Sequence, residues 1–227
     1  MIPLPLKRAA YRTLGAEDYS LTMALYRLGR GCEQSYRSFL QLLPPGGRLL
    51  DIGANIGLTV VYARKKRPDL KVVAFEPLPF NLAAAKRLCR ILHVGSVDFR
   101  EVALGDSTGT VEMVMPTVAQ MVASAQSYVV HDGFDYSPIL NEGGERFTVP
   151  LTMIDSLELP HVDGIKLDVE NFESHVLRGA IHLLKRDHPI IYCELWDTPN
   201  RREVIDFLGD LGYSYEKMAT KDDFLFR

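Results

Sequence analysis

A short apolar run that ends in a glycine turn, Leu49-Leu50-Asp51-Ile52-Gly53-Ala54-Asn55-Ile56-Gly57, is the most informative part of the chain. The run over residues 49–52 is typical of a buried strand, and residues 56–66 read as a helix. A glycine between a strand and a helix lets a ligand approach the backbone closely, and the free N–H groups of the helix N-terminus favour a carboxylate or phosphate. The stretch therefore predicts a strand–turn–helix unit that binds an anionic group.

Strands and helices are expected to alternate through most of the remaining chain. Alternation with helices of this length implies crossover connections and a parallel sheet, and so an α/β fold. The pattern predicts further strands at residues 71–75, 97–104, 110–115, 147–151, 164–169, 190–195, 213–218 and 224–226, and helices at 79–92, 172–185 and 198–211.

Two segments lie outside this alternation. Residues 1–43 are predicted to form an N-terminal helical extension, with helix from about residue 17 to residue 43 that breaks near Gly29 and Gly31. The main domain is then expected to comprise residues 44–227. Residues 116–146 are rich in Ser, Gly and polar side chains, and a stretch this long is typical of a functional lid or a disordered segment.

The composition excludes several classes of protein. With 47% hydrophobic and 24% charged residues in 227, the chain is not expected to be disordered, collagenous or a coiled coil. Lys and Arg total 26 against 29 for Asp and Glu, and this net charge of −3 argues against a nucleic-acid partner. We find no apolar stretch long enough to span a membrane, no signal-peptide pattern and no C-x-x-C pair, so a cytoplasmic location is expected.

A second signal is Phe75-Glu76-Pro77, where Glu76 ends the predicted second strand 19 residues beyond Gly57. An acid about 20 residues after such a glycine turn is placed to accept the ribose hydroxyls of a nucleoside, although Glu76 could instead cap the next helix. A dinucleotide fingerprint would need glycine at positions 53, 55 and 58, but Asn55 and Leu58 occupy two of them, which disfavours NAD and FAD.

Three motifs occur in order along the chain: Asp51-x-Gly53-Ala54-Asn55-x-Gly57, Phe75-Glu76-Pro77-x-Pro79-x-Asn81 and Lys166-x-Asp168-x-Glu170-x-Phe172-Glu173. Together they resemble the FkbM family of S-adenosylmethionine-dependent methyltransferases. The resemblance implies the class I methyltransferase fold, which is Rossmann-like and has a mostly parallel seven-stranded sheet with helices on both faces. It also implies S-adenosyl-L-methionine as cofactor and transfer to a hydroxyl of a natural product or sugar.

The resemblance assigns a set of cofactor-binding residues. Around the methionine part it places Asp51, Gly53, Ala54, Asn55 and Gly57; at the ribose it places Glu76; and around the adenine it places Phe75, Pro77, Ala103 and Leu104, with Asp106 as a further candidate for the adenine amino group. The chain departs from the family at Asn171, where glycine is usual. Asparagine is among the residues that best tolerate a left-handed backbone, so the turn is expected to survive.

Carboxyl groups gather at the end of the predicted strand 164–169 and at the end of the next strand, 190–195. Lys166, Asp168 and Glu170 alternate in sequence and are expected to share one face of a strand. Asp168 is the first choice for the catalytic residue and Glu170 the second, because a carboxylate can take the hydroxyl proton during methyl transfer. No metal is assigned, although Asp168, Glu170 and Glu194 could offer oxygen ligands to a divalent cation. His131, in the polar stretch, is an alternative base or a solvated loop residue.

The leading interpretation is a methyltransferase that moves a methyl group from S-adenosylmethionine to a hydroxyl of a small molecule, without a nucleic-acid partner. The alternative is a catalytically silent module that binds a nucleoside or S-adenosylmethionine and acts through partners. A nicotinamide oxidoreductase is disfavoured by Asn55. The sequence does not indicate the acceptor or the oligomeric state.

Overall fold

Seven strands form the main sheet of the computed structural model, which describes residues 4–29, 34–118, 121–122, 127–131, 144–220 and 222–227. The sheet order is β11-β12-β10-β9-β1-β2-β3, and β12 alone among these strands runs antiparallel to the others. The strands are β1 (Arg48–Ile52), β2 (Lys71–Phe75), β3 (Asp98–Arg100), β9 (Gly164–Leu167), β10 (Ile190–Glu194), β11 (Tyr215–Lys217) and β12 (Asp223–Phe226). This is the mostly parallel seven-stranded sheet that the sequence predicts.

Helices cover both faces of this sheet, and successive residues of its strands face different cores. Leu49 packs with Phe39 and Val60, whereas its neighbour Leu50 packs with Val176 and Leu208. The helices are α2 (Gln34–Leu42), α3 (Leu58–Lys66) and α4 (Pro79–Ile91), and then α5 (Glu173–Arg178), α6 (Ile181–Asp187) and α7 (Pro199–Asp210). The period-two alternation of a strand thus divides the apolar residues between two layers of helix.

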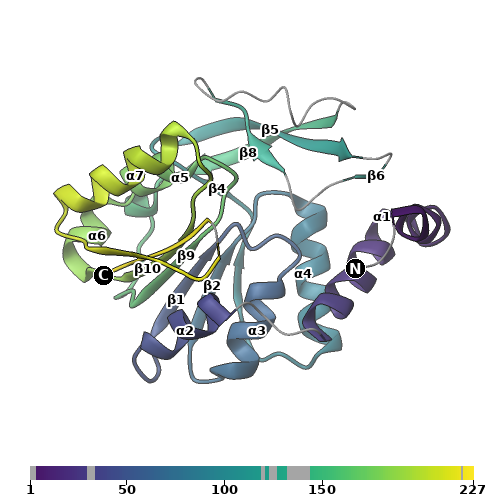
Figure 1. Ribbon diagram of the computed structural model, residues 1–227, viewed down its shortest axis with the longest axis horizontal. Coiled ribbons are helices and arrows are strands. Elements are labelled where there is room, and N and C mark those ends of the chain that lie inside the picture. Colours follow the sequence, from purple (N-terminus) through teal and green to yellow (C-terminus); the bar gives the residue numbers. More distant parts are fainter. Residues whose placement is uncertain (1–3, 30–33, 119–120, 123–126, 132–143, 221) are drawn as a thin grey trace.

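A smaller sheet lies beside the main one and crosses the upper part of the view in Figure 1. Its order is β4-β8-β5-β6, and β7 pairs with β5. The strands are β4 (Ala103–Leu104), β5 (Gly109–Val118), β6 (Met121–Val122), β7 (Tyr128–Val129) and β8 (Gly144–Thr152). The stretch 116–146 was predicted to be a functional lid or a disordered segment, and residues 116–118, 121–122, 128–129 and 144–146 of it are strand. Residues 119–120, 123–126 and 132–143 lie outside the described residues.

Two predicted elements are divided in the structure, and each division comes from a contact with a distant segment. The strand expected over 97–104 becomes β3 and β4, because Ala103 and Leu104 pair with β8 instead of β2. The helix expected over 172–185 breaks between α5 and α6 at Gly179. A Cβ atom there would lie 1.9 Å from the Gly105 carbonyl oxygen, so this close contact between two backbones requires glycine.

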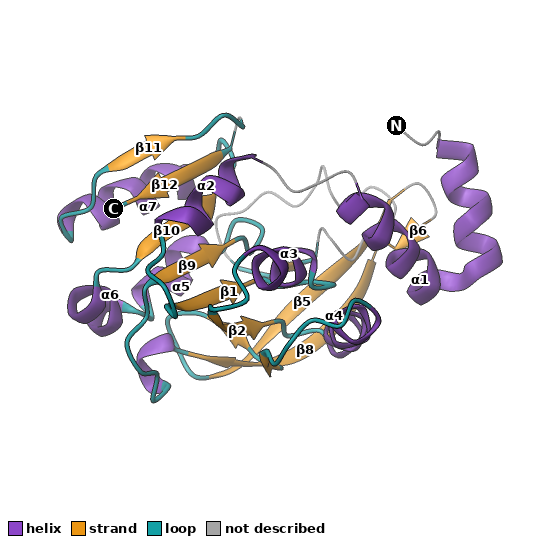
Figure 2. Ribbon diagram, turned by 90° about the horizontal axis from the view of Figure 1, so that it is seen from below, coloured by secondary structure: helices purple, strands orange, loops and turns teal. Residues whose placement is uncertain are grey.

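The N-terminal region consists of helix α1 (Leu4–Gly29) and α2. Helix α1 begins earlier than predicted and has a kink at Gly15, where φ is 78°; it lies at one end of the molecule (Figure 2). Phe39 and Leu40 of α2 are buried in the same core as Leu49 and Tyr192, so α2 packs directly on the sheet. The division of the chain at residue 43 stays a prediction. No helix within the described ranges has the length and apolar character to cross a bilayer.

Candidate functional site

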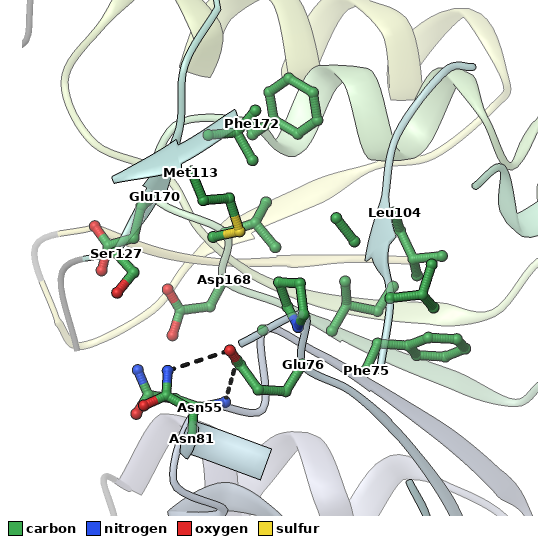
Figure 3. A pocket seen from close by; sticks show the side chains of 17 residues that line it. Asn55, Phe75, Glu76, Asn81, Leu104, Met113, Ser127, Asp168, Glu170 and Phe172 are labelled. Atoms are coloured by element: carbon green, nitrogen blue, oxygen red, sulfur yellow. Dashed lines mark hydrogen bonds between the residues drawn. The ribbon is translucent and has the colours of Figure 1, made fainter. Parts of the chain in front are cut away.

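A pocket opens where the chain leaves β1, β2 and β9, at the carboxyl edge of the main sheet (Figure 3). It contains about 610 Å³ of free space, a volume that includes the solvent at its open mouth. Most of the predicted site residues line it: Gly53, Asn55, Phe75, Glu76, Pro77, Ala103, Leu104, Asp168 and Glu170. Open parallel sheets bind ligands at this edge, so the sheet order itself brings these residues together.

The turn after β1 is folded back against β2 and β9. The N–H groups of Gly53 and Ala54 both donate to the Phe75 carbonyl oxygen, at 3.1 and 3.0 Å. Gly53 has φ of 76°, and a Cβ atom on it would lie 1.9 Å from the Asp168 carbonyl oxygen. The glycine is therefore required by the protein's own backbone, in addition to any ligand that approaches it.

Three other predicted cofactor residues lie behind the lining. Asp51 is fully buried and accepts a hydrogen bond from the Thr59 hydroxyl at 2.6 Å. Ala54 is buried in the core, and Gly57 begins α3 with φ of 82°. We place these three residues as supports of the turn, while Gly53 and Asn55 contact the pocket.

Glu76 forms the floor of the pocket, and its buried carboxylate receives three donors. Oε2 accepts the N–H of Asn55 at 2.9 Å, and Oε1 accepts the side-chain amide of Asn81 at 3.2 Å (Figure 3). Oε1 also accepts the N–H of Leu78 at 3.0 Å. Burial raises the pKa of Glu76, while these donors act in the opposite direction. Each carboxylate oxygen has two lone pairs, so Oε2 retains one for a ligand hydroxyl.

The wall next to Glu76 is apolar. Phe75, Ala103 and Leu104 are buried side chains that line it, and Figure 3 shows Phe75 and Leu104 on the side of the pocket away from Asp168. An apolar wall beside a carboxylate suits a nucleoside, whose base is flat and whose sugar carries hydroxyls. Asp106, the further candidate for the adenine amino group, is exposed, pairs with His175 Nδ1 at 2.7 Å and is not among the lining residues, so its contact with the adenine stays a prediction.

A buried ammonium connects the turn to the acidic side of the pocket. Lys166 Nζ donates to the Gly53 carbonyl oxygen at 3.0 Å and lies 3.2 Å from Asp168 Oδ2 and 3.5 Å from Asp51 Oδ1. Burial alone would lower the pKa of Lys166, but the carboxylates of Asp168 and Asp51 raise it above its usual value. A charge in this position is stable because two carboxylates and a carbonyl surround it.

The prediction that Lys166, Asp168 and Glu170 alternate along one strand is wrong. Strand β9 ends at Leu167, and the chain then turns through Glu170 and Asn171, whose φ angles are 54° and 72°. The expectation that Asn171 supports a left-handed backbone is confirmed. Both carboxyl groups nevertheless reach the pocket, because the turn redirects Glu170 toward it (Figure 3).

Glu173 holds this turn in place and does not line the pocket. Its Oε1 accepts the N–H groups of Val169 and Asn171 at 3.1 and 3.2 Å, and its Oε2 accepts the Asn200 amide. Burial raises the pKa of Glu173 to about 7 despite these donors. The carboxyl group at the start of α5 is therefore a structural tie between the helix and the turn that carries Glu170.

Glu170 is surrounded by acids. Burial, followed by the carboxyl groups of Asp168, Glu194 and Glu173, raises the pKa of Glu170 to about 9. Burial and Asp168 also raise the pKa of Glu194, at the end of β10, to about 7. Glu170 Oε2 is buried and has no hydrogen-bond partner among the residues that the structure describes.

Several lining residues were not assigned by the sequence analysis. Met113 of β5, Ser127 and Val129 come from the smaller sheet and its connections, and Phe172 closes the pocket beside Met113 (Figure 3). Ser127 and Val129 lie within the stretch 116–146, which was expected to be functional, but no motif marked them individually. His131 packs against Phe172, with ring centres 5.2 Å apart, and does not itself line the pocket. In the described part of the chain, no group of three or more His, Cys, Asp or Glu side chains is arranged to hold a metal ion.

Comparisons with known proteins agree with this geometry. Residues 51–215 match the family described as "Methyltransferase FkbM domain". The chain is 26% identical over 160 residues to the "31-O-demethyl-FK506 methyltransferase FkbM" of Streptomyces tacrolimicus, with 61% of each chain covered. It is 54% identical over 167 residues to the "AMB antimetabolite synthetase AmbE" of Pseudomonas aeruginosa, covering 61% of this chain and 8% of that one.

Among solved structures, the chain resembles a "Methyltransferase FkbM" from Methylobacillus flagellatus. The TM-score is 0.58 at 14% identity, and the match covers 96% of this chain and 58% of the other. That likeness confirms the class I methyltransferase fold. The match covers 61% of the Streptomyces protein and 58% of the Methylobacillus protein, so the chain spans about three fifths of the length of each.

Proposed function

Since the chain belongs to the FkbM methyltransferase family, whose members use S-adenosylmethionine, we propose that it transfers a methyl group to a hydroxyl of a small molecule. The observation that carries this proposal is a single pocket with two different ends. Glu76 and an apolar wall form one end, and Asp168, paired with Lys166, forms the other. The name of the Streptomyces relative, which specifies O-methylation of a natural product, supports the acceptor class.

The residues of the turn and of β2 fit the cofactor. Gly53 and Asn55 would hold the methionine part, supported by Asp51, Ala54 and Gly57. Glu76 Oε2, with its remaining lone pair, would accept a ribose hydroxyl. The adenine would lie against the apolar wall of Phe75, Pro77, Ala103 and Leu104.

Asp168 is proposed as the group that takes the proton of the acceptor hydroxyl. It lines the pocket, about a third of its side chain is exposed, and Lys166 stabilises its charge. When bound, S-adenosylmethionine supplies the methyl group, whose bond to sulfur breaks with the electron pair left on sulfur as the acceptor oxygen bonds to carbon. Alignment contributes much of the acceleration of such an in-line transfer, so the rigid turn at Gly53 is part of the machinery.

Cofactor binding is tested first, without an acceptor. We expect saturating S-adenosylhomocysteine to stabilise the protein by about 2.7 kcal/mol at a hundred times its dissociation constant, and NAD to have no effect. Stabilisation by NAD alone would overturn the proposed site.

Transfer is tested with methyl-labelled S-adenosylmethionine and pools of hydroxylated metabolites. We expect the label in a product that survives mild alkali, because methyl ethers resist hydrolysis and methyl esters do not. Asp168→Asn should keep its affinity for S-adenosylhomocysteine and lose transfer by about 100-fold or more. Label on nitrogen or in an ester would contradict a hydroxyl acceptor, and binding without transfer to any pool would favour the silent module.

A further inference from the structure

The two acidic residues of the pocket have different electrostatic surroundings, although only Val169 separates them in the chain. Asp168 Oδ2 lies 3.2 Å from the buried ammonium of Lys166. Among the described residues, no basic side chain forms an ion pair with Glu170, and its Oε2 is buried without a partner. The groups that influence Glu170 are Asp168 on the strand end, Glu194 on β10, Glu173 on α5 and, more weakly, Lys166.

Lys166 cannot serve both acids equally. Its Nζ donates to the Gly53 carbonyl oxygen and lies within ion-pair distance of Asp51 and Asp168. Asp51 is fully buried and accepts a hydrogen bond from Thr59, so it attracts the ammonium from the side of β1. Of Asp168 and Glu170, Asp168 is therefore the one whose charge Lys166 stabilises more.

The backbone explains how Glu170 remains in this unfavourable place. Glu170 and the following Asn171 are both left-handed, with φ of 54° and 72°. Glu173 accepts the N–H groups on either side of Glu170, and Thr198 donates to the Asn171 side chain. A non-glycine residue in such a conformation costs free energy, and it persists only where the surrounding structure enforces it, as is common at functional sites.

We propose that Lys166 is a positioning residue that holds Asp168 in place as the proton acceptor, while Glu170 is a neutral carboxylic acid that donates a hydrogen bond to a second oxygen of the acceptor. This inference rests on the proposed methyl transfer and makes it more specific. In the reaction, the acceptor hydroxyl gives its proton to Asp168 and its oxygen bonds to the methyl carbon. Glu170 keeps its own proton throughout, so the preferred acceptor carries an oxygen near the reacting hydroxyl.

Two carboxyl groups whose environments separate their proton affinities are the usual basis for acid and base roles in one site. The raised pKa of Glu170, about 9, agrees with a neutral side chain at physiological pH. Burial with an unpaired oxygen is costly unless a ligand completes the hydrogen bonds, so the acceptor itself is the expected partner.

The protonation of Glu170 is measured without any acceptor. We expect the infrared difference between the wild-type protein and Glu170→Gln at pH 7 to contain the carbonyl stretch of a protonated carboxyl group, and this band to disappear as the pH rises through about 9. Glu158→Gln is the matched control, because Glu158 is exposed, and its difference spectrum should lack the band. Absence of the band with Glu170→Gln would overturn the assignment.

The pH dependence of the free energy of unfolding tests the protonation of Glu170 independently. The folded protein holds a proton on Glu170 that the unfolded chain releases above its usual pKa of 4.5. The contribution of Glu170 to the free energy of unfolding is therefore complete below pH 4.5 and is lost as the pH rises toward about 9. In Glu170→Gln, the urea midpoint should fall less steeply over this pH range than in the wild-type protein. If Glu170→Gln does not fold, carbon-13 labelling of the glutamates reports the same titration in the unaltered protein.

The roles of both residues are then separated in the labelled transfer assay. Glu170→Gln retains a donor and should lose less activity than Glu170→Ala, which should lower kcat/KM for the acceptor about tenfold, the value of one hydrogen bond. Lys166→Gln should lower kcat while the KM for the acceptor changes little, because the ammonium that lies 3.2 Å from Asp168 Oδ2 and positions it is then absent. A larger loss in Glu170→Gln than in Asp168→Asn would make Glu170 the base, whereas methyl transfer itself would stand.

Discussion

Glu76 and Glu170 lie on the same edge of one sheet, but the surroundings of their carboxyl groups are opposite in hydrogen bonding and charge. Three donors converge on the Glu76 carboxylate, from Asn55, Leu78 and Asn81. Glu170 has acids around it and one buried oxygen without a partner in the described part of the molecule. The end of the pocket proposed for the cofactor is thus complete before any ligand binds, whereas the end proposed for the acceptor is not.

This difference indicates how the work of binding is divided. Preorganised donors around Glu76 keep a charged acceptor ready for hydroxyls, so little reorganisation is needed when the nucleoside arrives. The unpaired Glu170 raises the free energy of the empty site, and a ligand oxygen that accepts its proton removes this cost.

Gly53→Ala is expected to have the largest effect, because Gly53 is the point at which the two ends touch. The added Cβ would meet the Asp168 carbonyl oxygen at 1.9 Å, on a backbone with φ of 76°. The free energy of unfolding should fall by about 3 kcal/mol or more, and affinity for S-adenosylhomocysteine should be lost. Urea denaturation and calorimetry measure the two effects.

Gly209→Ala is the control for this substitution. Gly209 lies in helix α7, exposed, and nothing approaches within 4 Å of the position of its Cβ. Alanine there should stabilise the protein by about 0.5–1 kcal/mol, because it favours the helix. If Gly53→Ala changed the free energy of unfolding as little as Gly209→Ala, the contact at Gly53 would not couple the two ends of the pocket.

Glu76→Gln tests the completed end of the pocket. The substitution removes the charge and turns an amide group toward donors from Asn55, Leu78 and Asn81. We expect affinity for S-adenosylhomocysteine to fall about 100-fold, equal to about 2.7 kcal/mol, with a smaller change in the free energy of unfolding. Isothermal titration calorimetry measures the affinity, and Glu158→Gln, which changes an exposed glutamate, should leave it unaltered. Equal affinities for Glu76→Gln and wild type would remove the ribose role.

The completed end was largely predictable from the sequence. A strand, a glycine turn and an acid at the end of the next strand follow from local patterns, and parallel pairing places Gly53 and Glu76 together. The reason for a glycine at position 53 was only half predicted. A Cβ atom there would clash with Asp168, which follows β9 and is more than a hundred residues away in the chain. The tertiary contact therefore imposed a requirement that no local pattern contains.

The incomplete end was less predictable, for the same reason. The sequence indicated Asp168 and Glu170 but continued the strand through both, whereas the chain leaves the strand after Leu167. Met113 and Val129 reach the pocket through pairing in the smaller sheet, and such pairing depends on contacts between distant segments. The split of the strand expected at 97–104 has this origin too, because Ala103 pairs with Leu151.

Asn171 offers the smallest effect and the finest test of the strained acceptor end. Asn171→Gly and Asn171→Ala both remove the hydrogen bond from Thr198, but only alanine adds a Cβ penalty at φ of 72°. The alanine variant should therefore unfold about 1 kcal/mol more easily than the glycine variant, as urea midpoints would measure. Equal stabilities would mean that the turn relaxes without cost. The surrounding acids and helix would then hold Glu170 in the pocket, and backbone strain at this turn would not contribute to its position.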